Sequence, residues 1–212
     1  MPNFNGFSPK QLVALWKAHR NAGVALKRAA EALQVFKAEG GRPFRGLLSS
    51  WFGDDSTETV NHLESVVENM VHQYDGDNWV GVYTATLPMN AYAVAEAFHR
   101  KGTSHAELLS QVKSLIDEKV ATGQRLVIQF SQRFFELDAV GTQPGMESQM
   151  QTFLHEFSHV AAGTKDYHWE KSGDKFCYGV EGCDVAKKRG ASKARNNAEN
   201  ISFFLSEFWY TK

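Results

Sequence analysis

Cysteine and proline are scarce in this 212-residue sequence, with two and five residues, and no apolar run approaches about 18 residues, the length that a membrane-spanning helix needs. The cysteines, Cys177 and Cys183, are too few for a disulfide framework, and both a local bridge and two free thiols stay open. Neither charge is in excess, since 23 lysines and arginines face 24 aspartates and glutamates, a net charge of −1. With no global positive field, we expect neither a nucleic-acid partner nor a membrane span.

Apolar residues are plentiful, at 42%, and five of them are tryptophans. A chain of this length and composition can bury a sizeable core. We therefore expect residues 1–212 to form a single domain, with residues 1–41 as an N-terminal helical extension packed on it. The first seven residues lack the charged, apolar and small-residue regions of a signal peptide.

The periodicity of apolar residues predicts several helices and a small sheet, which indicates an α+β fold. Residues 90–100 fit either a strand or a helix. Helices are predicted over 9–39 behind a capping box at Ser8, over 57–74 with Asp55 or Ser56 as cap, over 108–120, around residue 155, and from about 192 to 208, and strands are predicted over 79–84 and 125–130.

The pentapeptide HEFSH at residues 155–159 is the strongest chemical signal in the chain. Positions i and i+4 of a helix lie on one face, so His155 and His159 can reach the same metal ion. Glu156 stands where its carboxylate can take a proton from water without being a ligand. The surrounding residues are largely apolar, and a buried histidine pair without a partner would be costly. We therefore expect a zinc hydrolase.

A catalytic zinc site needs a third protein ligand and an open position for water. Gly163 can end the helix and turn the chain back, which brings Asp166 within reach of the ion. His168, two residues further on, is the alternative ligand. Two histidines and a carboxylate with an open position favour Zn²⁺, one per chain, as the cofactor.

The sequence HEFSH followed by GTKD resembles the aspzincins, the deuterolysin and peptidyl-Lys metalloendopeptidase group. In that family the aspartate of GTxD is the third zinc ligand, which implies Asp166 rather than His168. The likeness extends over most of the chain in the family's order. The other segments that resemble the family are WFG at 51–53, the run 141–152, and NNAEN at 196–200 followed by Phe203 and Phe204.

This resemblance implies a zincin-like metalloprotease domain, mainly helical with a small sheet whose edge lies along the substrate cleft. It also implies that the protein hydrolyses peptide bonds in proteins or peptides, with Glu156 as the catalytic carboxylate. Many members are secreted. We therefore expect the protein to act outside the producing cytosol, by secretion or as an effector or toxin delivered without a cleavable signal. Its oligomeric state is not indicated.

The oxyanion donor departs from the family pattern. Aspzincins place a tyrosine three residues after the aspartate, in GTxDxxYG, but that position is Trp169 here. A Tyr-Gly pair occurs later, so we infer an insertion that makes Tyr178 the catalytic oxyanion residue. Tyr167 is the alternative, and either tyrosine can instead serve only in packing.

The specificity pocket departs as well. Lysine-specific members place two acidic residues, three positions apart on the C-terminal helix, in the pocket for the residue after the cut. The matching positions are Glu199 and Ser202, so one carboxylate remains. We expect Glu199 to bind substrate, with a preference for a basic residue after the cut. Alternatively, Glu199 supports a metal ligand by a hydrogen bond, or it is simply a charged residue of the helix with no role in the site.

Two other functions stay open. A zincin-fold binding or toxin module could keep the metal with weak proteolysis, but it would not need Glu156. A zinc amidase acting on a non-protein amide would use the same metal chemistry.

Overall fold

The computed structural model describes residues 3–38, 44–85, 87, 91–95, 126–168 and 177–211. The predicted helix at 108–120 and about half of the ambiguous segment at 90–100 lie outside these residues. The elements are β1 (Asn3–Asn5), α1 (Pro9–Ala38), α2 (Arg45–Phe52), α3 (Thr57–Asp75), β2 (Trp79–Tyr83), β3 (Ala93–Ala95), β4 (Leu126–Phe130), the 3-10 helix η2 (Gln132–Glu136), α5 (Gln149–Ala162), α6 (Gly179–Lys188), α7 (Ala191–Ala194) and α8 (Ala198–Tyr210).

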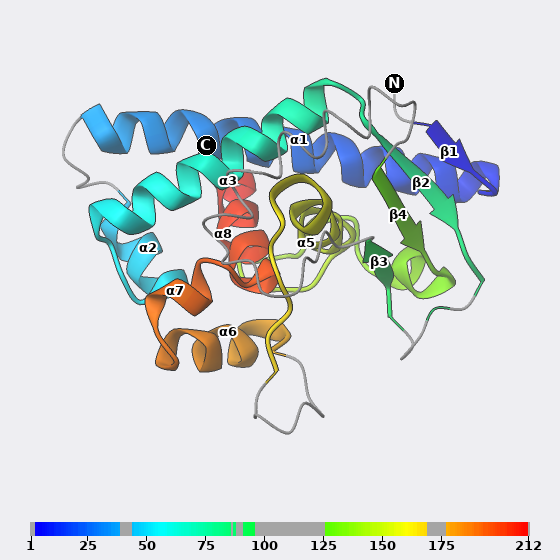
Figure 1. The fold of residues 1–212 in the computed structure, drawn as a ribbon. Coiled ribbons are helices and arrows are strands. Elements are labelled where there is room, and N and C mark those ends of the chain that lie inside the picture. Colours follow the sequence, from blue (N-terminus) through cyan, green and yellow to red (C-terminus); the bar gives the residue numbers. More distant parts are fainter. Residues whose placement is uncertain are drawn as a thin grey trace.

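Helix α1 is the long N-terminal helix that the periodicity predicts. Its capping box is formed: the Ser8 backbone N–H donates to Gln11 Oε1 at 2.8 Å, and the Gln11 N–H donates to Ser8 Oγ at 3.4 Å. Leu15 and Leu26 bury one face of α1 in the main core. The helix runs beside α3 and packs on α5 and α8 (Figure 1). Among the described helices, none has both the length and the apolar character to cross a membrane.

Within the described residues, four strands form one sheet in the order β1-β2-β4-β3. Strands β1, β2 and β4 are parallel, while β3 pairs antiparallel with β4, with Ala93 opposite Phe130. The two predicted strands are thus confirmed as β2 and β4. Strand β3 comes from the ambiguous segment, and it lies at the sheet edge against α5.

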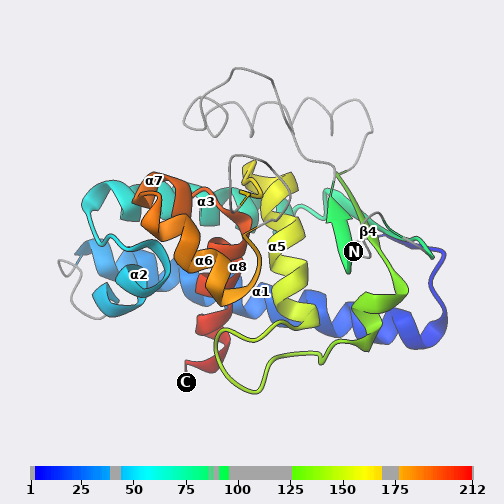
Figure 2. The same ribbon diagram turned by 90° about the horizontal axis from the view of Figure 1, so that it is seen from below.

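Helix α5 lies at the centre of the molecule, and all 14 of its residues are buried. On one side, the Phe153 and Phe157 rings lie 5.1 and 6.2 Å from the Trp79 ring of the sheet. On the other side it packs against α8. Figure 2 shows α5 between the sheet and the helices α6, α7 and α8. Because interiors are close-packed, side chains on α5 are held from both sides.

The helix predicted over about 192–208 is wrong as a single element, because two helices, α7 and α8, occupy this segment. Between them the backbone pairs with the strand-like segment that follows α5. The Lys165 N–H donates to Asn196 O at 2.9 Å, and the Ala198 N–H donates to Lys165 O at 3.0 Å. Backbone groups that hydrogen-bond in this pairing cannot also make the bonds of a continuous helix, so the helix is interrupted here.

Helix α2 was not predicted, since the sequence pattern left residues 45–52 as a connection. Gly53 ends it in the left-handed conformation, with φ 66°, and its N–H donates to Ser49 O. Leu48 and Phe52 are buried, and the Trp51 ring stacks on Phe203 of α8 at 5.2 Å. The WFG segment therefore ties α2 to the helix behind the site.

Candidate metal centre

Three donor atoms converge beside α5, contributed by His155, His159 and Asp166. The two histidine Nε2 atoms lie 3.2 Å apart, and Asp166 Oδ1 lies 3.2 Å from His155 Nε2 and 3.5 Å from His159 Nε2. Zinc bonds of about 2.0–2.2 Å in a tetrahedron place neighbouring ligand atoms about 3.3–3.5 Å apart. The three atoms therefore have the spacing of three corners of a zinc site, which leaves the fourth corner for water.

The orientation of both imidazoles is set at Nδ1. His155 Nδ1 lies 2.7 Å from Glu199 Oε2, and His159 Nδ1 lies 2.8 Å from the Thr164 carbonyl oxygen. A carbonyl oxygen and an ionised carboxylate can only accept hydrogen bonds. We therefore assign the ring proton of each histidine to Nδ1, the nitrogen that faces the acceptor. Nε2 is then the nitrogen of each ring that faces the other donor atoms and can bind a metal ion in place of a proton.

The turn after α5 carries Asp166 to the histidines. Gly163 has φ 67°, and its N–H donates to His159 O, which ends the helix where the sequence predicts. The hydroxyls of Ser158 and Thr164 lie 2.6 Å apart and fasten the turn. Lys165 then pairs with the backbone before α8, so Asp166 follows a segment held on two sides.

The electrostatics of the three residues fit a cation. Asp166 Oδ1 is buried without a hydrogen-bond donor among the described residues, and it faces the two Nε2 atoms. Burial lowers the pKa of His155, but Asp166 and Glu199 outweigh it and hold that pKa well above its usual value. Burial likewise raises the pKa of Asp166, but the imidazoles outweigh it and hold it low. The donor set therefore fits Zn²⁺.

Glu156 lies beside this group without being part of it. The side chain is buried on α5, where the edge strand β3 packs against the helix. Burial raises the pKa of Glu156, and Asp166 adds to the effect against the opposing influence of the two histidines. A carboxyl with a raised pKa is suited to take up a proton and return it.

Tyr178 reaches the centre from the N-terminus of α6. Its hydroxyl donates to Asp166 Oδ2 at 3.2 Å, and its ring lies 5.8 Å from the His155 ring, edge to face. Burial raises the pKa of Tyr178, and Asp166 and Glu156 raise it further. The phenol therefore stays protonated and can donate a hydrogen bond.

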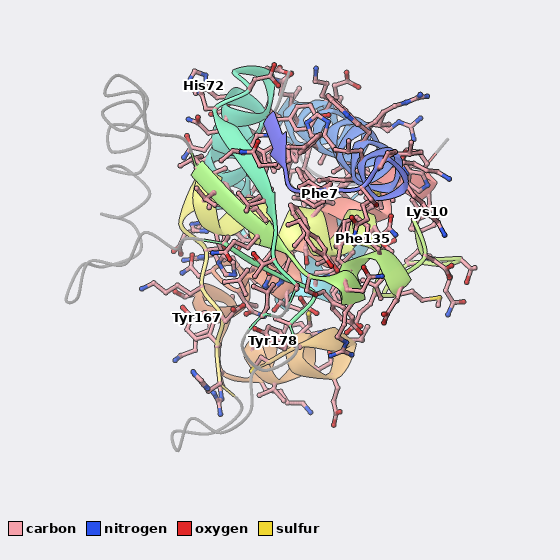
Figure 3. The ribbon with its side chains drawn as sticks, turned by 90° about the vertical axis from the view of Figure 1, so that its right-hand side faces the viewer. Phe7, Lys10, His72, Phe135, Tyr167 and Tyr178 are labelled. Carbon is pink, nitrogen blue, oxygen red and sulfur yellow. The ribbon has the colours of Figure 1, made fainter. Side chains whose placement is uncertain are left out.

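The alternatives from the sequence lie elsewhere. Tyr167 packs under the Lys193 ammonium, which lies 5.2 Å from the ring centre (Figure 3 shows Tyr167 apart from Tyr178). His168 is outside the group of converging donor atoms. Trp169, and most of the inferred insertion, lie outside the described residues.

A cavity of about 200 Å³ opens beside Glu156 and His155. Glu147, just before α5, and Arg133, on η2, are charged residues of its wall that sequence reasoning missed. Arg133 lies 4.9 Å from the centre of the Tyr92 ring, which also lines the cavity. Burial raises the pKa of Glu147, and Glu199 raises it further.

Glu199 lines the same cavity but is buried, at 4% exposure, and is hydrogen-bonded to the protein. Besides His155, it accepts from Gln151 Nε2 at 3.2 Å and from the Gly179 N–H at 2.7 Å. Ser202 accepts from Gln151 Nε2 at 2.9 Å. Glu199 is therefore built into the metal centre as well as the cavity wall.

The two cysteines are free thiols. Cys177 precedes Tyr178, and Cys183 lies on α6; both are buried. Burial raises the pKa of both thiols. Neither belongs to the group of converging donor atoms.

No protein-family model matches the chain, and no curated protein matches it. Among solved structures, the fold is similar to that of a zinc peptidase from Grifola frondosa, with a TM-score of 0.65 and 21% sequence identity. The superposition covers 94% of this chain and 96% of that one. At this identity the likeness establishes the fold alone. It confirms the α+β, zincin-like class, mainly helical with a small sheet.

Proposed function

We propose that this protein is a zinc-dependent endopeptidase that hydrolyses peptide bonds in protein or peptide substrates. The observation that carries the proposal is the tetrahedral spacing of three donor atoms, from His155, His159 and Asp166, beside the buried carboxyl of Glu156. The fold, shared with a zinc peptidase from Grifola frondosa, is consistent with it. Zn²⁺ held by the three residues supplies a Lewis acid that polarises a carbonyl and makes water more acidic.

In the proposed reaction Glu156 moves the proton. It takes the proton from the attacking water and passes it to the leaving amine, so the carboxyl ends the cycle as it began. Burial is the main cause of the raised pKa of Glu156, and a raised pKa favours proton uptake by its carboxylate.

Tyr178 is proposed as the hydrogen-bond donor to the oxyanion. Its hydroxyl already lies at the edge of the centre, on Asp166 Oδ2, and it stays protonated. A small rotation of the side chain can redirect this hydroxyl to a substrate oxygen. Donors aimed at developing charge stabilise the transition state most strongly.

The test of the proposal compares wild type with Glu156→Gln on a denatured protein and on a peptide library. The amide keeps the size of the side chain but cannot accept the proton, so peptide cleavage should fall by about 10²-fold or more. Zinc content, measured on the same samples, should stay at one per chain. Equal cleavage by both proteins, or none by zinc-loaded wild type, would reject the proposal. In the second case, a non-protein amide becomes the substrate to test.

We further propose a preference for a basic residue after the cut. The cavity beside Glu156 has the carboxylates of Glu147 and Glu199 in its wall, opposed by the guanidinium of Arg133. Burial is the main cause of the raised pKa of Glu147, and the nearby carboxylate of Glu199 raises it further. A substrate ammonium between the two carboxylates would be favoured by their negative charge.

Neutralising Glu147 should therefore weaken this preference. In Glu147→Gln, kcat/KM for a peptide with lysine after the cut should fall about tenfold relative to that for its leucine counterpart. A tenfold change corresponds to about 1.4 kcal/mol of transition-state stabilisation. The matched variant Arg133→Gln should shift the ratio in the opposite direction. If neither substitution changes the lysine-to-leucine ratio, the cavity does not select charge.

A further inference from the structure

Glu199 makes contacts with two separate parts of the centre. One carboxylate oxygen, Oε2, lies 2.7 Å from Nδ1 of His155, a metal-ligating residue in the proposed site. The other, Oε1, accepts the Gly179 backbone N–H, also at 2.7 Å. The carboxylate comes from the first turn of α8, so it joins α5 to the start of α6.

The contact with His155 determines which ring nitrogen faces the metal. A carboxylate that accepts from Nδ1–H keeps the lone pair on Nε2 and makes the ring a stronger ligand. His159 Nδ1 has the neutral groups of Thr164 in this place, the carbonyl oxygen at 2.8 Å and the hydroxyl at 3.4 Å. Of the two histidines, His155 therefore has the charged partner at Nδ1.

The contact with Gly179 holds the residue directly after Tyr178. Gly179 has φ +68°, and a side chain there would meet nothing within 4 Å, so the backbone conformation rather than space explains the glycine. Tyr178 thus has its backbone fixed on one side by Glu199, while its hydroxyl reaches Asp166. Figure 3 shows Tyr178 beside α6, whose first residue is Gly179.

Gln151 orients the carboxylate itself. Its Nε2 donates to both Glu199 Oε2 and Ser202 Oγ, at 3.2 and 2.9 Å, and Ser202 in turn donates to the Glu199 carbonyl oxygen at 3.0 Å. All of these groups are buried. A buried carboxylate with this set of donors has little rotational freedom.

We propose that Glu199 is a positioning residue whose single carboxylate sets both the metal ligand His155 and the placement of Tyr178. The inference rests on the proposed function in one respect, the roles given to these two residues. It assigns Glu199 a task in addition to lining the cavity. Ser202 and Gln151 support the carboxylate and carry no charge.

The substitution Glu199→Gln separates the two contacts. Glutamine has one acceptor oxygen for three donors, the His155 Nδ1–H, the Gly179 N–H and the Gln151 Nε2–H. If that oxygen stays on Gly179, the amide NH₂ faces Nδ1 and favours the tautomer with its proton on Nε2, which cannot bind metal. The variant should therefore lose zinc affinity about 10- to 100-fold while keeping the Gly179 hydrogen bond.

The experiment measures two properties that need no catalysis. The first is the affinity for Zn²⁺, by competition with a chelator. The second is hydrogen exchange of the Gly179 amide. Glu199→Gln should lose affinity and keep amide protection, whereas Glu199→Ala should lose both. Glu207→Gln makes the same substitution on α8 at a carboxylate that accepts from Trp51 Nε1 and belongs to neither the donor group nor the cavity wall. It should bind zinc within about twofold of wild type.

Wild-type zinc affinity in Glu199→Gln, or a protected Gly179 amide in Glu199→Ala, would overturn the proposal. Because Glu199→Gln is nearly isosteric, its thermal unfolding shows whether a loss comes from misfolding. Both measurements remain readable if the protein proves not to cleave peptides, so a failure of the proposed endopeptidase activity is distinguishable from a failure of the Glu199 inference.

Discussion

The two histidines of the centre are alike at Nε2 and different at Nδ1. His155 faces a buried carboxylate, and His159 faces a backbone carbonyl supplied by the turn that also delivers Asp166. The first partner is a side chain that substitution can remove. The second is a backbone group, with the Thr164 hydroxyl beside it at 3.4 Å, so it depends on the turn keeping its shape. The single glutamate therefore has the greater influence on how the centre can be tuned.

Replacing the Tyr178 hydroxyl tests its role directly. Tyr178→Phe should lower kcat/KM by about 10²- to 10³-fold, because the oxyanion loses a donor, while zinc content stays at one per chain. Tyr167→Phe is the matched control, since that ring packs under Lys193, and it should stay near wild type. Steady-state cleavage of one peptide by all three proteins decides the matter. Loss of activity in Tyr167→Phe with full activity in Tyr178→Phe would reverse the assignment.

Helix α5 and its terminal turn act as one unit. The helix is buried on all sides and presents both histidines, and the left-handed Gly163 sends the chain back within three residues to Asp166. Much of this unit was predictable, because i,i+4 spacing and a glycine after a helix are local signals. The division of the C-terminal segment into α7 and α8 was not, since it depends on backbone pairing between Lys165 and Asn197, far apart in the chain.

The turn should therefore be sensitive to a side chain at Gly163. Gly163→Ala forces a left-handed alanine and should lower the free energy of unfolding by about 1–2 kcal/mol. It should also lower zinc affinity, because the displaced turn moves Asp166. Gly53→Ala provides a matched control, with φ +66° and ordinary contacts at 3.7 Å. It should cost similar stability in urea unfolding and leave zinc affinity unchanged; equal zinc affinity in both variants would show that the turn does not place Asp166.

The complete site draws on the whole molecule. Its cavity wall combines β3, η2, Glu147 ahead of α5, α5 itself, the start of α6, and α8. Sequence spacing found the residues that lie close together in the chain, such as His155 and His159 on one helix and Asp166 after the turn that follows it. It missed Glu147 and Arg133, because nothing local marks them and only the fold brings them to Glu156. Glu199 was found through a family resemblance, but its contact with His155 depends on the packing of α8 against α5.

The central claim is that His155, His159 and Asp166 form a zinc site, and elemental mass spectrometry of the zinc-loaded, desalted protein tests it most directly. Wild type should hold one zinc per chain, and Asp166→Ala should lose most of it because two histidines alone hold the ion weakly. His168→Ala, which removes the alternative ligand, should retain one zinc. A metal-free wild type, or full zinc content in Asp166→Ala, would contradict the claim.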